Sequence, residues 1–173
     1  AHYVDDLQLP GMLHAAVVRS PHAHARIRSV DTSKAQATPG VEAVITGTDV
    51  QGVIGPVPCA AQIPDMKVAL RPVLSVDKVR FVGEPVAVVV ATDRYTARDA
   101  ADLVEVNYEP LTPVVDPEKA LEPGAPVLFE EMGSNVLWHD TLTYGDVDGA
   151  FARAAHVVRE RFTIHRYAST PLE

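Results

Sequence analysis

Residues 78–111 read KVRFVGEPVAVVVATDRYTARDAADLVEVNYEPL, and this stretch decides the fold class. Its valine-rich run at 86–90 is typical of a buried strand. Asp93 follows as a candidate helix N-cap, and small apolar residues then recur with the spacing of a helix that packs closely on a sheet, at Ala97, Ala100, Ala101 and Val104. Apolar and polar side chains alternate over 104–108, which predicts a second strand. Strand, helix and strand in succession predict an α+β fold.

Shorter elements precede this unit. The apolar centre of MLHAAVVRS at 12–20 predicts a mostly buried strand, and VEAVITG at 41–47 predicts another. Between them, Asp31 or Thr32 is expected to cap a short helix over SKAQA at 33–37. The first part of the chain is therefore expected to hold short strands and one small helix.

Two proline-rich segments are expected to lack regular structure. Residues 51–72 carry four prolines and two glycines around Cys59, and their lack of periodicity predicts a long surface connection. Residues 110–133 carry five prolines and two glycines, with a short helical piece at 118–121. This composition favours an extended arm packed over a neighbour, or a linker, over an independent core.

Organised structure is predicted again towards the C-terminus. Asp146 is expected to cap a helix that runs through Ala154. The sequence HVVRERFTIHRYA at 156–168 alternates and predicts a long strand. The chain stops at Glu173, directly after that strand, which is an abrupt place for a domain to end.

Composition narrows the function classes. With 173 residues, the chain is expected to form one domain, alone or with a smaller attachment. Its 15 Lys and Arg against 23 Asp and Glu give a net charge of −8, which disfavours binding to nucleic-acid backbones. The single Cys59 excludes an intramolecular disulfide and any multi-cysteine zinc or iron–sulfur site within the chain.

We expect a cytoplasmic protein without a transmembrane segment. The longest apolar run, at 86–91, is far shorter than the ~20 residues that span a bilayer, and the N-terminus has no signal-peptide pattern. Because the first residue is Ala1 rather than Met, we also expect that processing or truncation has removed preceding residues.

A His-x-His pair fenced by arginines stands out in RSPHAHARIRSVD at 19–31. On a strand, His22 and His24 would share one face and could hold a metal, as in a small zinc hydrolase. The arginines suggest an anion instead, and a third interpretation is that the stretch is scaffold. A metal site would need a further ligand, for which the candidates are a distant carboxylate or His14, His139, His156 or His165.

Other candidate residues favour structural roles. Asp5 and Asp6 lack the spacing of a calcium loop. Cys59 would need a histidine base to act as a nucleophile. The VGEPVA segment at 82–87 could line a site, but a turn into a strand that begins at Pro85 explains it more simply. No nucleotide, phosphate, serine-hydrolase or zinc-protease motif occurs, so we expect no catalytic, cofactor-binding or metal-ligating residue in this chain.

Five sequence blocks, in this order and over nearly the whole chain, resemble the start of the large subunit of molybdenum hydroxylases, the xanthine dehydrogenase and aldehyde oxidase family. They are YVDDLQLPGMLHAAVVRSPHAHARIRSVD at 3–31, PGVEAVITGTDV at 39–50, KVRFVGEPVAVVVATDRYTARDAADLVEVNYEPLTPVVDPEKAL at 78–121, GDVDGAFARAAHVVRERF at 145–162 and HRYASTPLE at 165–173. Within the family, they are most similar to large chains of the aerobic carbon monoxide dehydrogenase type. Each block alone is a weak signal, whereas their common order is specific.

The resemblance implies an α/β hammerhead domain at 1–111, an extended arm or linker at 112–143 and the incomplete start of the molybdopterin-binding domain at 144–173. It also implies that the arginine and histidine stretch is scaffold and fixes a turn and an interface through Arg19, His22, His24, Arg26 and Arg28. The family's cofactor loops and its glutamate base match no position here. Cys59 does not match the active-site cysteine of carbon monoxide dehydrogenases.

For the whole enzyme, the resemblance implies an oxidoreductase that inserts an oxygen from water into its substrate at molybdenum held by molybdopterin. Iron–sulfur clusters and FAD are then expected on partner subunits or domains, with the remainder of the large subunit and a second copy of the chain as further partners. Carbon monoxide, purines, N-heterocycles and aldehydes all remain candidate substrates. The isolated chain is expected to be inactive. The alternative from another class is a non-catalytic assembly or interaction module with the hammerhead fold.

Overall fold

The computed structural model describes residues 3, 6–61 and 63–165, and the chain divides into two compact units. One unit is Pro10–His139, which holds all the strands that the structure describes. The other is formed by Ala1–Leu9 with Asp140–Glu173, and its main described element is the helix α4 (Val147–Arg153).

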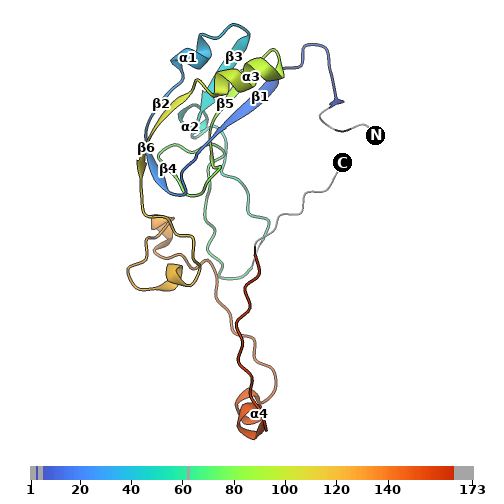
Figure 1. The fold of residues 1–173 in the computed structure, drawn as a ribbon, viewed down its shortest axis with the longest axis vertical. Coiled ribbons are helices and arrows are strands. Elements are labelled where there is room, and N and C mark those ends of the chain that lie inside the picture. The colour runs from blue at the N-terminus through green and yellow to red at the C-terminus, as the bar shows by residue number, and fades with distance from the viewer. Residues whose placement is uncertain (1–2, 4–5, 62, 166–173) are drawn as a thin grey trace. The chain divides into compact units, whose positions relative to one another are not determined.

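One of the two sheets of the larger unit is three-stranded and antiparallel (Figure 1). Its middle strand is β5 (Pro85–Ala91), with β1 (His14–Arg19) on one side and β3 (Val41–Thr46) on the other. The strands predicted from residues 12–20, 41–47 and 86–90 are therefore confirmed. The sequence signal for β5 is strong because a strand with a neighbour on each side and buried residues on both faces reads as a nearly continuous apolar run.

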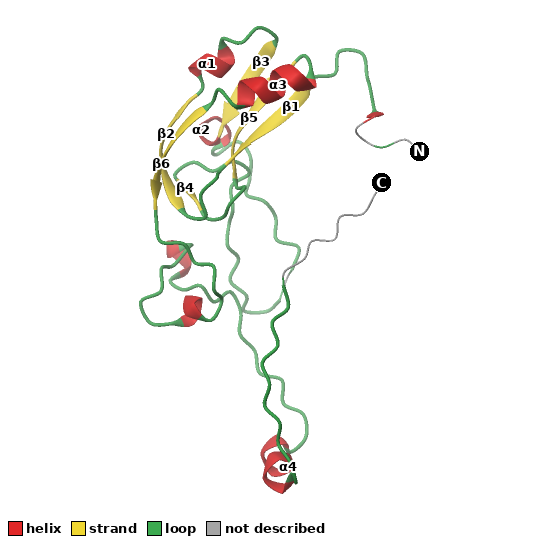
Figure 2. Ribbon diagram, viewed as in Figure 1, coloured by secondary structure: helices red, strands yellow, loops and turns green. Residues whose placement is uncertain are grey.

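The helix α3 (Arg94–Ala101) lies across this sheet, as Figure 2 shows. Its predicted cap is confirmed, since the Asp93 carboxylate accepts hydrogen bonds from the backbone N–H groups of Tyr95 and Thr96, both at 2.9 Å. Hydrogen bonds from Thr96 also hold the pKa of Asp93 below its ordinary value. The buried face of the helix carries only alanines, which let it approach the sheet closely, at Ala97, Ala100 and Ala101.

A second three-stranded sheet has the order β4-β2-β6, and its strands are β4 (Lys78–Val79), β2 (Ala25–Asp31) and β6 (Glu105–Pro110). The hydrophobic core consists of two clusters of buried residues that include side chains of the two sheets. One gathers Ala35, Ala87, Val89, Ala100, Ala101 and Val104, and the other Ala25, Val79 and Val86. The half-buried Val30 and Val106 pack against both clusters. The core is therefore continuous from one sheet to the other, and the predicted α+β class is confirmed.

Short helices complete the unit. The helix α1 (Ser33–Gln36) follows the predicted cap region, where Asp31 accepts a hydrogen bond from the Ser33 N–H. The helix α2 (Gly47–Val50) was not predicted, although its capping box between Thr46 and Asp49 follows a recognisable sequence pattern. Two 3-10 turns, η2 (Lys119–Leu121) and η3 (Glu130–Met132), lie in the proline-rich segment after β6, and η2 matches the helical piece expected there.

One prediction was wrong over the residues that the structure describes. The chain from His156 to His165 forms no strand, and residues 166–168 of the predicted strand lie outside the described residues. The physical reason is the lack of a pairing partner, because a strand needs a neighbour to satisfy its backbone groups. The apolar half of the alternation is almost fully exposed, at 80% for Val158, 86% for Phe162 and 88% for Ile164.

Gly47 is predicted to be essential for the packing of α2. A Cβ at this position would lie 2.4 Å from the Ser75 carbonyl oxygen, which is a backbone atom with little room to shift. We expect Gly47→Ala to lower the free energy of unfolding by about 1–3 kcal/mol. Gly55→Ala is the matched control, since its Cβ would meet nothing within 4 Å. Urea unfolding measures both variants, and equal stabilities would contradict the close approach at Gly47.

Candidate functional site

The histidine pair lies just before β2 and makes structural contacts. The imidazole of His22 packs against Tyr108, with 4.9 Å between ring centroids. His24 is 6% exposed, and its Nδ1 lies 2.7 Å from the carbonyl oxygen of Thr112. Because a carbonyl only accepts, Nδ1 carries the proton and donates. The pair therefore ties the start of β2 to the chain that follows β6.

The metal hypothesis finds no support in the geometry. Among residues 3, 6–61 and 63–165, no three His, Cys, Asp or Glu side chains are grouped so that they could hold a metal ion. The Nε2 of His24 is buried without a hydrogen-bond partner in the structure. The histidines considered as a third ligand, His14, His139, His156 and His165, do not join the pair in any such group.

The arginines around the pair also contact the protein itself. Arg19 donates from Nη1 to the carbonyl oxygen of Gly83 over 2.8 Å, which fixes the turn before β5. Arg28 forms an ion pair with Glu109 across the β2–β6 ladder. Arg26 stands in register with Glu109 and Lys78 on the two neighbouring strands. These contacts agree with the role of Arg19 in a turn and offer no separate anion site.

The turn at 82–87 contains a buried carboxylate that sequence reasoning missed. Glu84 is 3% exposed, and its side chain accepts a hydrogen bond from the backbone N–H of Arg80. Gly83 has a φ of 89° and donates its N–H to the Ser20 carbonyl oxygen over 2.8 Å. The segment is thus a tight turn that leads into β5, as the simpler interpretation predicted. A glutamate beside a glycine turn was the available signal.

Three cationic side chains hold residues 127–138, which we call the docking segment, within the larger unit. The ammonium group of Lys78, whose side chain is 5% exposed, pairs with the Glu130 carboxylate. Arg80 donates from Nε to the Leu128 carbonyl oxygen over 2.9 Å, and its guanidinium lies 4.6 Å from the centroid of the Phe129 ring. Lys67 also donates from Nζ to the Met132 carbonyl oxygen over 2.9 Å.

These contacts couple the charge of Glu130 to docking. The hydrogen bond from Lys78 lowers the pKa of Glu130 below its ordinary value. The ionised form of Glu130 is therefore favoured by the docked state. A buried ammonium group that loses its carboxylate partner is costly, so docking of the segment and burial of Lys78 depend on one another.

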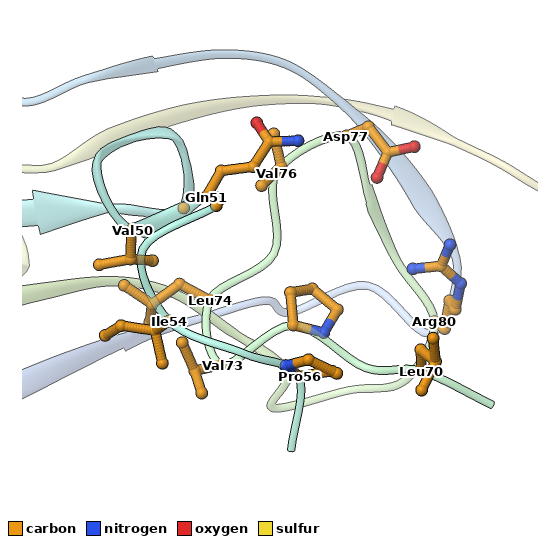
Figure 3. Close-up of a pocket in the computed structure, with 13 residues that line it drawn as sticks. Val50, Gln51, Ile54, Pro56, Leu70, Val73, Leu74, Val76, Asp77 and Arg80 are labelled. Carbon is orange, nitrogen blue, oxygen red and sulfur yellow. The ribbon is translucent and has the colours of Figure 1, made fainter. Parts of the chain in front are cut away.

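A cavity of about 370 Å³ opens between α2 and the loop that leads to β4 (Figure 3). Most of its wall is apolar, and Gln51, Asp77 and Arg80 supply the polar side chains. The Arg80 guanidinium already donates to main-chain carbonyls of Leu128 and Lys78. A phosphate-bearing pterin requires several donors that are directed into its site, and the described wall of this cavity does not match that requirement.

The described contacts of Cys59 and of Asp6 are local hydrogen bonds and form no catalytic or metal-binding group. The Cys59 thiol is exposed and donates weakly to the Ala61 carbonyl oxygen at 3.5 Å. Asp6 accepts a hydrogen bond from the Tyr3 N–H over 2.9 Å, while Asp5 lies outside the described residues. No helix within the described ranges is long and apolar enough to cross a membrane.

Comparisons with known proteins identify relatives over nearly the whole chain. Residues 1–112 match the sequence profile described as the aldehyde oxidase and xanthine dehydrogenase a/b hammerhead domain. The carbon monoxide dehydrogenase large chain of Afipia carboxidovorans is 45% identical over an alignment 185 residues long, which covers 99% of this chain and 22% of the relative.

Two solved structures agree with this match. Quinoline 2-oxidoreductase from Pseudomonas putida 86 superposes with a TM-score of 0.84 at 43% identity, over 91% of this chain and 20% of that chain. The Cu,Mo-CO dehydrogenase in its carbon monoxide reduced state superposes with a TM-score of 0.68 at 45% identity, over 87% of this chain and 20% of that chain. The chain thus spans about a fifth of the length of these proteins.

The histidine pair is predicted to be dispensable for metal content. We expect the double substitution His22→Gln and His24→Gln to leave bound zinc unchanged, because the described contacts are an aromatic stack and a hydrogen bond to a carbonyl. The cost in stability should be about 1 kcal/mol for each lost hydrogen bond. Elemental analysis and thermal unfolding test this. A loss of stoichiometric zinc, or a melting temperature that zinc raises in the wild type alone, would restore the metal hypothesis.

The docking segment is predicted to loosen when Glu130 loses its charge. For Glu130→Gln we expect residues 127–138 to exchange their amides faster at pH 7, by an amount equivalent to about 1 kcal/mol, since Glu130 is 60% exposed and water screens the pair. Because the pKa of Glu130 is lowered on folding, its contribution is complete above the ordinary carboxyl range and is lost as the pH falls through the lowered pKa.

The matched control for this prediction is Glu131→Gln, one position further along the 3-10 turn η3. We expect this variant to exchange like the wild type at each pH. The Glu130→Gln variant should lack the wild type's acid-dependent loosening. Identical exchange of the docking segment in wild type and Glu130→Gln at pH 7 would mean that the contact with Lys78 contributes nothing to docking.

Proposed function

We propose that this chain, which belongs to the aldehyde oxidase and xanthine dehydrogenase family, is the scaffold domain of the large, catalytic subunit of a molybdenum hydroxylase. Within the family, it matches the N-terminal domain of large subunits such as that of carbon monoxide dehydrogenase. The observation that carries the proposal is the match itself, which covers 99% of the chain but only 22% of a large chain at 45% identity. The resemblance drawn from the five sequence blocks and the hammerhead fold are both confirmed by these relatives.

We propose that this part of the subunit is a folded scaffold that helps to position the rest of the subunit and does not supply the active site. The polar residues that the sequence singled out make contacts within the larger unit, as described for His24, Arg19 and Arg28. The wall of the cavity beside α2 does not match the donor set that a molybdopterin requires. We therefore propose that the residues that bind the cofactor and act on the substrate lie in the rest of the large subunit.

We propose three parts for this chain within that subunit: a hammerhead domain at 1–111, an arm at 112–143 and the incomplete start of the molybdopterin-binding domain at 144–173. Only the second boundary has support in the structure, because residues 112–139 belong to the same compact unit as the hammerhead strands. Side chains from β4 and the loop before it hold residues 127–138 of the proposed arm within that unit. The compact unit to which the hammerhead strands belong ends at His139, and residues from Asp140 onwards are grouped separately.

The whole enzyme is proposed to be a molybdopterin-dependent oxidoreductase of the carbon monoxide or xanthine dehydrogenase type. One solved relative is a Cu,Mo-CO dehydrogenase, which supports molybdenum as the metal of the whole enzyme. The Afipia relative is named a large chain, which supports an enzyme that also has smaller partner chains. Iron–sulfur clusters and FAD are proposed for those partners, which would carry electrons away from molybdenum. Carbon monoxide, purines, N-heterocycles and aldehydes remain the substrate classes, and a cytoplasmic location is part of the proposal.

A non-catalytic assembly module is the second candidate, and the closed core of the larger unit favours it. Among the described residues, both buried clusters use only side chains of Pro10–His139, which favours a part that folds by itself. The coding sequence after Glu173 separates the two candidates. Continuation into a polypeptide several times longer, with cofactor-binding segments, supports the enzyme, and a stop codon supports the module.

The purified chain is predicted to fold, to retain no molybdenum after incubation with molybdopterin and desalting, and to reduce no dye with carbon monoxide, purines or aldehydes. The polypeptide of full length, prepared with its partner subunits, is expected to retain stoichiometric molybdenum and to oxidise one of these substrate classes. Molybdenum analysis and dye-reduction assays measure both preparations. Cofactor retained by the chain alone would contradict the scaffold role, and a full-length complex without molybdenum would contradict the proposed enzyme.

A further inference from the structure

The cavity beside α2 forms part of a larger apolar surface. Its wall includes Val50, Ile54, Leu70, Val73 and Leu74, and we call these residues together with the neighbouring Val53 the α2 surface. Figure 3 shows the aliphatic side chains of Val50, Ile54, Val73 and Leu74 gathered on one side of the cavity. Three members are largely exposed, with Val53 at 80%, Leu70 at 61% and Ile54 at 53%. An exposed apolar patch around a cavity is typical of a contact site.

The chemistry of the wall favours an apolar protein segment over a polar small molecule. Small-molecule sites combine an apolar wall with a few polar groups that converge on the ligand. Here the main cationic group, the Arg80 guanidinium, is engaged by the Leu128 carbonyl oxygen and by the face of Phe129. What the cavity offers in excess is aliphatic surface, so a large aliphatic or aromatic side chain would be buried there favourably.

The length of the relatives points to the source of that segment. The chain superposes over 91% of its length on quinoline 2-oxidoreductase, and the superposed part is only 20% of that solved chain. Most of the polypeptide in such a chain lies outside the part that corresponds to this one. A segment of the same polypeptide is present at a high effective concentration, so it needs less buried area to dock than a separate molecule does.

We propose that the α2 surface is the docking site for an apolar segment of the same large subunit, from the part of the polypeptide outside residues 1–173, and that an aliphatic or aromatic side chain of this segment fills the cavity. The inference rests on the proposed function, because it requires a longer subunit. It assigns to the loop at 51–72 a specific task, which is to present Ile54 and Leu70 to the rest of the subunit.

Thiol labelling at Leu70 tests the proposal. Leu70→Cys is made in a Cys59→Ser background, both in the 173-residue chain and in the full-length subunit within its complex, and the labelling of this one site is followed by peptide mass spectrometry. We expect rapid labelling in the chain alone, where position 70 is 61% exposed. In the full-length subunit we expect labelling to be at least about tenfold slower, since a covered thiol reacts only through local opening.

Leu103→Cys is the matched control, because this leucine is 40% exposed and lies between α3 and β6, away from the residues that line the cavity. Its labelling rate should be similar in both proteins. Equal labelling of Leu70→Cys in the two proteins, or equal slowing at positions 70 and 103, would overturn the proposal.

Two other occupants give distinct results. Labelling of Leu70→Cys in the chain alone that slows as its concentration rises would identify a second copy as the occupant and overturn the proposal. Protection in the full-length subunit that disappears after gel filtration would identify a dissociable small molecule and also overturn it. Molybdenum content of the same full-length preparation reports on the proposed function separately, so the two failures are distinguishable.

Discussion

The burial of β5 is the constraint on which the rest of this structure depends. Val86 belongs to one buried cluster, while Ala87 and Val89 belong to the other, and all three are fully buried. Side chains on the two faces of β5 therefore contribute to the two buried clusters of the core. A fully buried valine contributes about 1.5–3 kcal/mol, and the alanines let α3 lie close to the sheet. Both flanking strands take their register from β5, so the positions of β1, β3 and α3 follow from it.

The parts of the fold that the sequence predicted are those with local signals. The run at 86–90, the Asp93 cap and the alanine stripe of α3 can be recognised within a few neighbouring residues, and all three were found. By contrast, β2 was not identified as an element. Its alternation is short, with Ala25 and Ile27 next to exposed arginines, and its partners β4 and β6 lie far along the chain. The false strand at 156–165 shows the opposite error. Its alternation was clear, but alternation stabilises a strand only where a partner pairs with it.

The contacts of the site were hidden from sequence reasoning for a similar reason. Lys78 meets Glu130 across 52 positions, and Arg80 meets Leu128 across 48. Neither pair has a helical or strand spacing that would reveal it. The His-x-His pair had a visible spacing, yet the structure uses the two rings differently, one against Tyr108 and one on the Thr112 carbonyl. A short motif gives the residue types, whereas the tautomer and partner of each ring depend on the fold.

The distribution of apolar surface connects the fold to the proposed role of a domain in a longer subunit. The buried clusters use small aliphatic residues almost exclusively, so the larger side chains of the chain remain outside them. Several of those are nearly bare, including Leu142 at 94% and Tyr144 at 95%, which belong to the smaller unit. If nothing covered these side chains, their apolar surface would stay in contact with water and would favour aggregation. The same patches are favourable if further polypeptide covers them, because each then stabilises the assembled subunit in addition to the core that already holds the hammerhead together.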